Sequence, residues 1–196
     1  VIALSLHVDY WDYIGWKDPF AQSRFAQRQH WPSAQGPGSP VYTPEVFAGM
    51  KELRGWQDKD LVESRIHAIN GQPAPAQITL RMDSSGTGAA LLEARFALAA
   101  PRPGGGMAQG VVIVYEKQLS SEIPAGENRG ATLRHDNVVR YWSAPVVFDA
   151  RSGRAEWRQS VDLPAGWKRE NLGVAALIED AKGGELLQAV AMPGCV

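Results

Sequence analysis

Hydrophobic residues crowd the first eleven positions of the chain. Polar alternation is nearly absent among Val1, Ile2, Leu4, Leu6 and Val8. This pattern is typical of a strand that is buried on both faces. Asp18 and Pro19 then predict the start of a helix, because aspartate caps free backbone amides and proline suits the first helical turn. Trp31-Pro32 should end that helix, since a residue before proline avoids the α conformation.

A second group of elements is predicted between residues 45 and 71. Glu45–Ala48 and Glu52–Trp56 are expected to be short strands joined by a hairpin. Asp58 should cap a second helix, which ends at Asn70-Gly71. One face of this helix is apolar and comprises Leu61, Val62, Ile66 and Ile69. Residues 33–40, where Gly, Ser and Pro are frequent, are expected to form a loop.

The hydrophobic period changes to two after residue 75. Ile78, Leu80 and Met82 alternate with polar positions, and a second alternating set is Leu92, Ala94, Phe96 and Leu98. Further strands are predicted at Val111–Glu116, Asn137–Trp142, Val146–Phe148, Ala155–Leu163, Leu172–Glu179 and Leu186–Ala191. Roughly seven strands over about 120 residues indicate an antiparallel sandwich, with a barrel as the alternative. Gln72-Pro73-Ala74-Pro75 is a linker candidate, so we expect one domain over residues 1–71 and another over 76–196.

The composition narrows the classes of function. Twenty basic residues balance twenty-one acidic ones, and no basic cluster occurs, so no nucleic-acid partner is expected. No apolar run reaches the roughly 20 residues that a membrane-spanning helix needs. The one cysteine, Cys195, cannot form an internal disulfide. No phosphate loop or dinucleotide fingerprint occurs either, and we expect no cofactor.

Two strings of residues carry a resemblance to a known family. They are the aromatic and acidic string from His7 to Phe20, and Val41-Tyr42-Thr43-Pro44. In them the chain resembles the bacterial secreted, thioredoxin-like proteins known as domain of unknown function 1223. The similarity covers residues 1 to about 71 with specific motifs. Over the second domain it depends on the shorter motifs at 126–130 and 135–140.

The resemblance implies a thioredoxin-like domain that is periplasmic or secreted and has a Cys-x-x-Cys pair ahead of the first residues seen here. This chain departs from that pattern, because it begins inside a predicted strand and contains no such pair. We therefore expect a partial thioredoxin-like α/β domain, without its first strand and cysteine helix, followed by an antiparallel β-sandwich. The parent protein would be a thiol–disulfide oxidoreductase acting on protein or peptide substrates, and this chain would itself be inactive. The alternative is a non-catalytic binding or assembly protein that docks its partner on the sandwich.

The resemblance also implies a substrate-binding segment at Tyr42, Thr43 and Pro44. In a thioredoxin fold the peptide bond before this proline is cis, and the backbone of the preceding residue pairs with an extended substrate. A trans proline in an ordinary turn is the alternative.

His7, Asp9 and Trp11 form a candidate polar site, because alternate residues of a strand share one face. A histidine beside a carboxylate could relay a proton or bind a metal. Two ligands are too few for a metal centre, so none is predicted. The alternative is a strand end where these side chains bond to the next loop and Trp11 packs. A second polar set, open to a similar structural explanation, comprises His135, Asp136 and Arg140.

A strand at residues 1–11 without its neighbour would expose an apolar edge. Such edges pair readily with another chain. The sequence therefore predicts that the isolated chain is poorly stable or forms a homodimer through this edge.

Overall fold

The structure is a computed structural model that describes residues 1–30, 41–84, 88–100, 107–182 and 184–193. The loop expected at 33–40, Trp31-Pro32 and Cys195 lie outside the described residues. The helical elements are η1 (Asp12–Ile14), α1 (Ser23–Gln29), α2 (Lys59–Asn70) and η3 (Arg169–Asn171). The strands are β1 (Phe47–Ala48), β2 (Lys51–Glu52), β3 (Ala76–Asp83), β4 (Ala89–Leu98), β5 (Ala108–Glu116), β6 (Leu119–Glu122), β7 (Thr132–His135), β8 (Val138–Trp142), β9 (Val146–Val147), β10 (Arg154–Asp162), β11 (Leu172–Asp180) and β12 (Leu186–Pro193).

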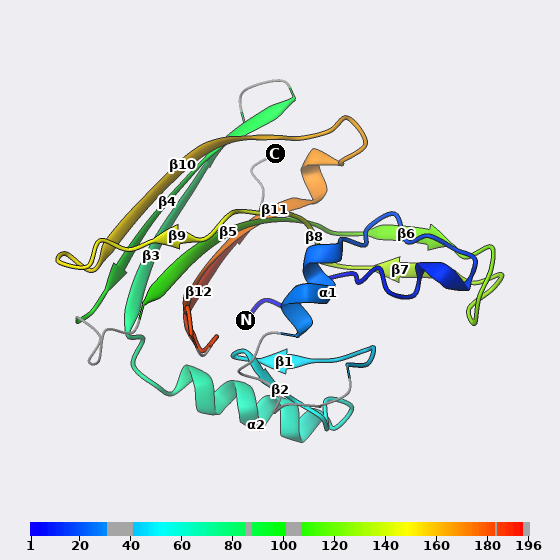
Figure 1. Cartoon of the computed structure of the whole chain (residues 1–196), viewed down its shortest axis with the longest axis horizontal. Coiled ribbons are helices and arrows are strands. Elements are labelled where there is room, and N and C mark those ends of the chain that lie inside the picture. The colour runs from blue at the N-terminus through cyan, green and yellow to red at the C-terminus, as the bar shows by residue number, and fades with distance from the viewer. Residues whose placement is uncertain (31–40, 85–87, 101–106, 183, 194–196) are drawn as a thin grey trace.

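Two antiparallel sheets form the body of the molecule (Figure 1). One sheet has the order β10-β4-β3, and the other has the order β12-β11-β5-β8 with β9 also paired to β5. Side chains from both sheets share one core, whose most deeply buried members include Leu92, Phe96, Val112, Val174 and Ile178. The β-rich fold with antiparallel sheets that the two-residue period predicted is therefore confirmed.

The outer face of the larger sheet is covered by the beginning of the chain. A second apolar cluster joins Phe25 of α1 to Val111, Ile113, Tyr115, Val139, Ala175 and Leu177 of the sheet, and Ile2, Leu4, Leu6 and Val8 pack against it. Because both faces of β5 and β11 are covered, nearly every residue of these strands is buried. Their sequences are continuous apolar runs for this reason.

The strand predicted over residues 1–11 is not formed. The segment is extended and makes a single isolated parallel bridge, between Ser5 and Val138. Its apolar residues do pack against the sheet, because a hydrophobic pattern reports burial of side chains rather than pairing of the backbone. The homodimer expectation, which depended on a strand edge here, gains no support from this arrangement.

The first helix begins later than predicted. Asp18 accepts a hydrogen bond from the amide of Phe20 at 2.8 Å, which makes a turn rather than a helix cap, and α1 starts at Ser23. An Asp-Pro pair serves turns as well as helix starts, so the sequence alone does not separate the two. The second helix is confirmed, because the Asp58 side chain accepts from the amides of Asp60 and Leu61 at the start of α2.

Two hairpins differ from the sequence prediction. β1 and β2 have two residues each, shorter than the predicted 45–48 and 52–56. The β6–β7 hairpin was not predicted, because its strands are mostly polar and lack a clear apolar alternation. Figure 1 shows this hairpin extending away from the two sheets, beside the first residues of the chain.

The passage from α2 to β3 lies at the predicted linker, residues 72–75. The first eight residues and α1 nevertheless pack on the sheet of the second half, and the division into two domains stays a prediction. No helix within the described ranges is long and apolar enough to cross a membrane.

Candidate functional site

The structure brings two of the predicted site segments together. The indole Nε1 of Trp11 donates a hydrogen bond to the Thr43 hydroxyl at 2.9 Å. Trp11 is 44% exposed, and Thr43 and Pro44 are exposed as well. The Thr43–Pro44 peptide bond is cis. A candidate binding surface therefore forms where residues that are 32 positions apart in the sequence meet.

A second aromatic ring enlarges this surface. Tyr13 is 77% exposed, and its ring stacks on Trp11 with 6.1 Å between centroids and 29° between planes. The β6–β7 loop packs against η1, which carries Tyr13. Gly126 of this loop, at φ +82°, leaves room for Ile14 of η1, and a Cβ there would come within 2.9 Å of the Ile14 side chain. We call the surface formed by Trp11, Tyr13, Thr43 and Pro44 the aromatic face.

Gln29 of α1 links the parts of the chain behind the aromatic face. Its Oε1 accepts from the Tyr10 hydroxyl at 3.0 Å. Its Nε2 donates to the carbonyl of Tyr42 at 2.8 Å and to the Glu45 carboxylate at 2.6 Å. Sequence reasoning missed Gln29, because a glutamine near the end of a helix gives no signal of its partners.

Tyr42 is held by a carboxylate. Its hydroxyl donates to Glu52 Oε1 at 2.7 Å, and Arg54 bonds to the same carboxylate at 3.0 Å. The hydrogen bond to Glu52 raises the pKa of Tyr42 and lowers the pKa of Glu52. The phenol therefore stays a neutral donor near neutral pH, and the Tyr42-Thr43-Pro44 segment is anchored at its first residue.

His7 bonds to Asp18, and not to Asp9, which was expected to share its face of a strand. Its Nδ1 lies 2.6 Å from Asp18 Oδ2. Asp9 contributes its backbone carbonyl to the amide of Asp12, and Trp11 bonds to Thr43. The set of His7, Asp9 and Trp11 is therefore divided between two places rather than gathered in one polar site.

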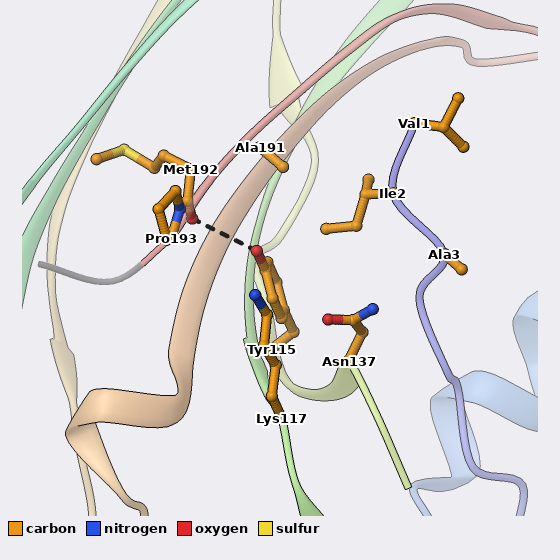
Figure 2. Close-up of a pocket in the computed structure, with 9 residues that line it drawn as sticks. All are labelled: Val1, Ile2, Ala3, Tyr115, Lys117, Asn137, Ala191, Met192 and Pro193. Carbon is orange, nitrogen blue, oxygen red and sulfur yellow. Dashed lines mark hydrogen bonds between the residues drawn. The ribbon is translucent and has the colours of Figure 1, made fainter.

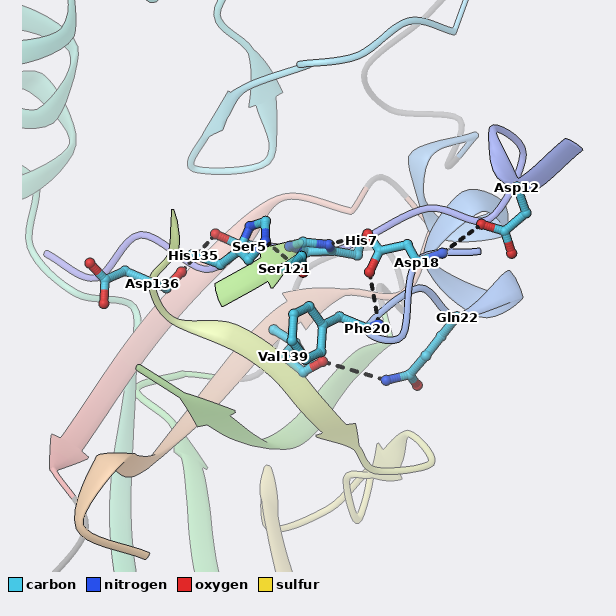
Figure 3. A network of polar contacts seen from close by, with 10 residues as sticks. All are labelled: Ser5, His7, Asp12, Asp18, Phe20, Gln22, Ser121, His135, Asp136 and Val139. Carbon is cyan, nitrogen blue, oxygen red and sulfur yellow. Dashed lines mark hydrogen bonds and ion pairs between the residues drawn. The ribbon is translucent and has the colours of Figure 1, made fainter. Parts of the chain in front are cut away.

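His7 and His135 form the second cluster of the region (Figure 3). Their rings meet edge to face with centroids 4.9 Å apart, and the Phe20 ring lies 5.6 Å from each. His135 Nε2 lies 3.1 Å from the hydroxyl of Ser121. Nothing in the sequence paired these histidines, because 128 positions separate 7 from 135.

Burial sets the protonation of this cluster. It lowers the pKa of His135, and the nearby charge of His7 lowers it further against a smaller opposing effect of Asp18. Burial also acts to raise the pKa of Asp18, but hydrogen bonds from His7 and from the Phe20 amide hold the pKa below its usual value. The cluster thus favours an ionised Asp18 bonded to His7 and a neutral His135 packed on the other side of the contact between the two rings.

Residues 1–179 match the family described as "Protein of unknown function (DUF1223)". The chain belongs to this family. No curated protein matches the DUF1223 chain. Among solved structures, HBP35 of Porphyromonas gingivalis is similar with a TM-score of 0.53 at 13% identity, over 68% of this chain and 45% of that one. The DUF1223 chain therefore spans less than half of the HBP35 chain, and the likeness indicates a shared fold over the covered part.

Two further solved structures are less similar. A domain of the outer membrane lipoprotein Omp28 from Porphyromonas gingivalis has a TM-score of 0.36 at 15% identity, over 62% of this chain and 89% of that one. The MHC-like protein MILL2 has a TM-score of 0.27 at 8% identity, over 69% and 41% of the respective chains.

The DUF1223 chain also has a pocket of about 350 Å³ between its first residues and the end of β12 (Figure 2). The pocket is lined by Val1, Ile2, Ala3, Tyr115, Lys117, Asn137, Ala191, Met192 and Pro193. The carboxamide oxygen of Asn137 is buried there without a hydrogen-bond partner in the described part of the chain. None of the site residues predicted from the sequence lines this pocket.

The acidic and imidazole side chains do not form a metal centre in the part of the chain that the structure describes. There, no group of three or more His, Cys, Asp or Glu side chains is placed to hold a metal ion. His7, His135 and Asp18 are instead engaged with each other and with Ser121.

Proposed function

We propose that this DUF1223 chain carries the substrate-binding face of an exported, thioredoxin-like thiol–disulfide oxidoreductase. The observation that supports this most directly is the hydrogen bond between the exposed Trp11 and Thr43. It places an aromatic platform next to the segment that the resemblance associates with substrate. An extended polypeptide would pair with the backbone of Thr43 and pack its side chains on Trp11 and Tyr13.

The proposal assigns the chemistry to groups outside these 196 residues. The chain has one cysteine, and thiol–disulfide exchange needs a thiolate that attacks a substrate disulfide and a second thiol that resolves the mixed disulfide. A Cys-x-x-Cys pair in the full-length gene product would supply both sulfurs. The chain's own residues would then orient the substrate backbone and keep the scissile disulfide at the thiolate.

The partial thioredoxin-like domain over residues 1–71 and the periplasmic or secreted location belong to the same proposal. Both are supported by the resemblance in the His7–Phe20 string and in Val41-Tyr42-Thr43-Pro44. The α2 helix and the short β1–β2 hairpin that follow Pro44 agree with this order of elements.

Removing the aromatic platform should weaken substrate binding by this chain. A fluorescein-labelled, carboxymethylated insulin B chain is a suitable probe, because its blocked cysteines cannot form disulfides and any binding is therefore non-covalent. We expect Trp11→Ala to raise its Kd about fivefold, since an aromatic contact contributes about 0.5–1.5 kcal/mol. Thr43→Val, which removes the acceptor of the Trp11 hydrogen bond but keeps the side-chain volume, should act in the same direction.

Thr79→Val is the matched control, because Thr79 is exposed on β3 and away from the aromatic face. Fluorescence anisotropy gives the Kd of all four proteins. Equal affinity of the wild type and Trp11→Ala, or no measurable binding at all, would exclude the aromatic face as the binding site.

Turnover by the full-length gene product tests the oxidoreductase part of the proposal. It should reduce insulin disulfides with dithiothreitol as the electron donor, and serine in place of either cysteine of its Cys-x-x-Cys pair should abolish the reaction. Peptide binding without turnover, or a gene product that has no cysteine pair, would instead identify a non-catalytic binding protein.

A further inference from the structure

His7 and His135 lie where the first residues of the chain meet the β6–β7 hairpin and β8. His7 comes from the extended first segment, His135 from the last position of β7, and Asp18 and Phe20 from the turn before α1. Ser121 of β6 completes the contact to His135. Figure 3 shows the two imidazoles between the segment and the hairpin. The pair therefore joins parts of the chain that have no strand pairing beyond one bridge.

Few backbone hydrogen bonds hold the first segment in place. The amide of Ser5 donates to the Asn137 carbonyl, and the amide of Val139 donates to the Ser5 carbonyl, both at 2.9 Å. The Ser5 hydroxyl donates to the Asp136 carbonyl at 2.8 Å, and the amide of Gln22 donates to the carbonyl of His7 at 3.1 Å. Within residues 5–11, Leu6 and Val8 also pack on the larger sheet. With so few backbone bonds besides this packing, the segment can open locally while the two sheets remain folded.

The charged groups around the two imidazoles would leave a positive charge on His135 poorly compensated. Among the described carboxylates, Asp18 is the one that bonds to an imidazole. Arg140 of β8 adds a positive charge, with its guanidinium 5.0 Å from the centre of the Phe20 ring. Glu116 of β5 lies 3.5 Å from Arg140 and accepts from the amide of Lys168.

Two further carboxylates near the cluster are also engaged by backbone amides. Asp12 accepts from the amide of Asp18 at 3.2 Å, and Asp136 accepts from the amide of Gln118 at 3.0 Å. Because Asp18 is bonded to His7, a proton added to His135 would have no described carboxylate bonded to it, and it would stand on a half-buried ring that packs edge to face on the His7 ring with centroids 4.9 Å apart. Partial burial without a bonded counter-charge disfavours the protonated form of His135.

We propose that His7 and His135 form a proton-operated latch: protonation of His135 against His7 releases residues 5–11 from β6, β7 and β8 and moves Trp11 away from Thr43. This goes beyond the proposed function and does not depend on it, because the latch is a property of the contacts between the segment and the sheet. If the aromatic face binds substrate, the latch makes that binding sensitive to pH.

The direction of the pH dependence follows from the preference of the closed latch for a neutral His135. Its pKa is lowered when the latch is closed, whereas an opened, hydrated His135 would titrate near the usual value of about 6.5. The open state therefore binds more protons than the closed state. Closure is favoured at pH values above about 6.5 and is lost as the pH falls below about 6.5. Asp18, whose pKa is also lowered, stays ionised through this range and continues to hold His7.

Native-state hydrogen exchange tests the latch. Between about pH 7 and pH 5, the protection factors of the Ser5 and Val139 amides, corrected for intrinsic exchange rates, should fall about tenfold as His135 is protonated in the open state. His135→Gln can keep the bond to Ser121 but cannot be protonated, so it should abolish this fall. His67→Gln, at an exposed position of α2, should behave like the wild type.

Two results would overturn the proposal. One is an equal loss of protection in His135→Gln, and the other is a loss that extends to the amides of β5 and β11, which would indicate global unfolding. If His135→Gln does not fold, NMR titration of the wild type decides the question. The titration midpoint of the His135 ring must then coincide with the midpoint of the Ser5 and Val139 exchange, and a mismatch excludes the latch.

Discussion

Replacing Glu179 by alanine should lower the free energy of unfolding by about 3–5 kcal/mol, because it removes a fully buried carboxylate from the largely buried guanidinium of Arg28. The Glu179 side chain on β11 is fully buried, and Arg28 of α1 bonds to it at 2.6 Å. Gln109 of β5 donates to the same carboxylate at 2.8 Å. The guanidinium of Arg28 also lies 4.3 Å from the centre of the Trp142 ring. This ion pair fastens α1 to the outer face of the sheet, and chemical denaturation monitored by circular dichroism measures its loss.

An exposed ion pair provides the matched control. Glu93 and Arg158 lie 2.9 Å apart on the surface of the smaller sheet, and Glu93→Ala should cost no more than about 1 kcal/mol. The double variant Arg28→Met with Glu179→Leu replaces both charges by apolar groups and should recover at least half of the loss. A loss in Glu179→Ala as small as that in Glu93→Ala would contradict the assignment of a buried ion pair.

Replacing Phe96 by alanine should destabilise the protein by about 3–5 kcal/mol through the cavity that it leaves. Phe96 of β4 is 2% exposed in the core between the two sheets. Its ring lies against Phe148, with centroids 6.1 Å apart. It also covers Gly110 of β5, where a Cβ would come within 2.9 Å of the ring. Urea denaturation measures the effect, and Val147→Ala, at a 74% exposed position, should change stability by no more than about 0.5 kcal/mol.

The contact between Phe96 and Gly110 can be tested by a double-mutant cycle. Gly110→Ala should destabilise the wild type by about 1–3 kcal/mol, because the added methyl group overpacks against the ring. In the Phe96→Ala background the same methyl group enters the cavity, so its cost should fall or change sign. Additive effects of the two substitutions would show that the ring does not cover β5 as described.

The sequence proposed residues of the aromatic face but not the contact between them. Tyr42, Thr43 and Pro44 were predicted through a family resemblance, and Trp11 was predicted as part of a polar site with His7 and Asp9. The bond between Trp11 and Thr43 spans 32 positions, and no local pattern encodes it. The same limit applies to Gln29 and Asp18, because hydrogen-bond partners of polar side chains depend on how distant segments meet.

By itself, the sequence determined the strands of the two sheets and the helix that begins after Asp58. These features are local, since an apolar alternation or a capping side chain acts over a few residues. The tertiary structure decided that the apolar residues at the start of the chain cover the outer face of a sheet instead of forming a strand. It also decided that His7 meets Asp18 and His135. The physical reason is that burial can be satisfied in many ways, and only the packing of the complete chain selects which backbone and side-chain groups become partners.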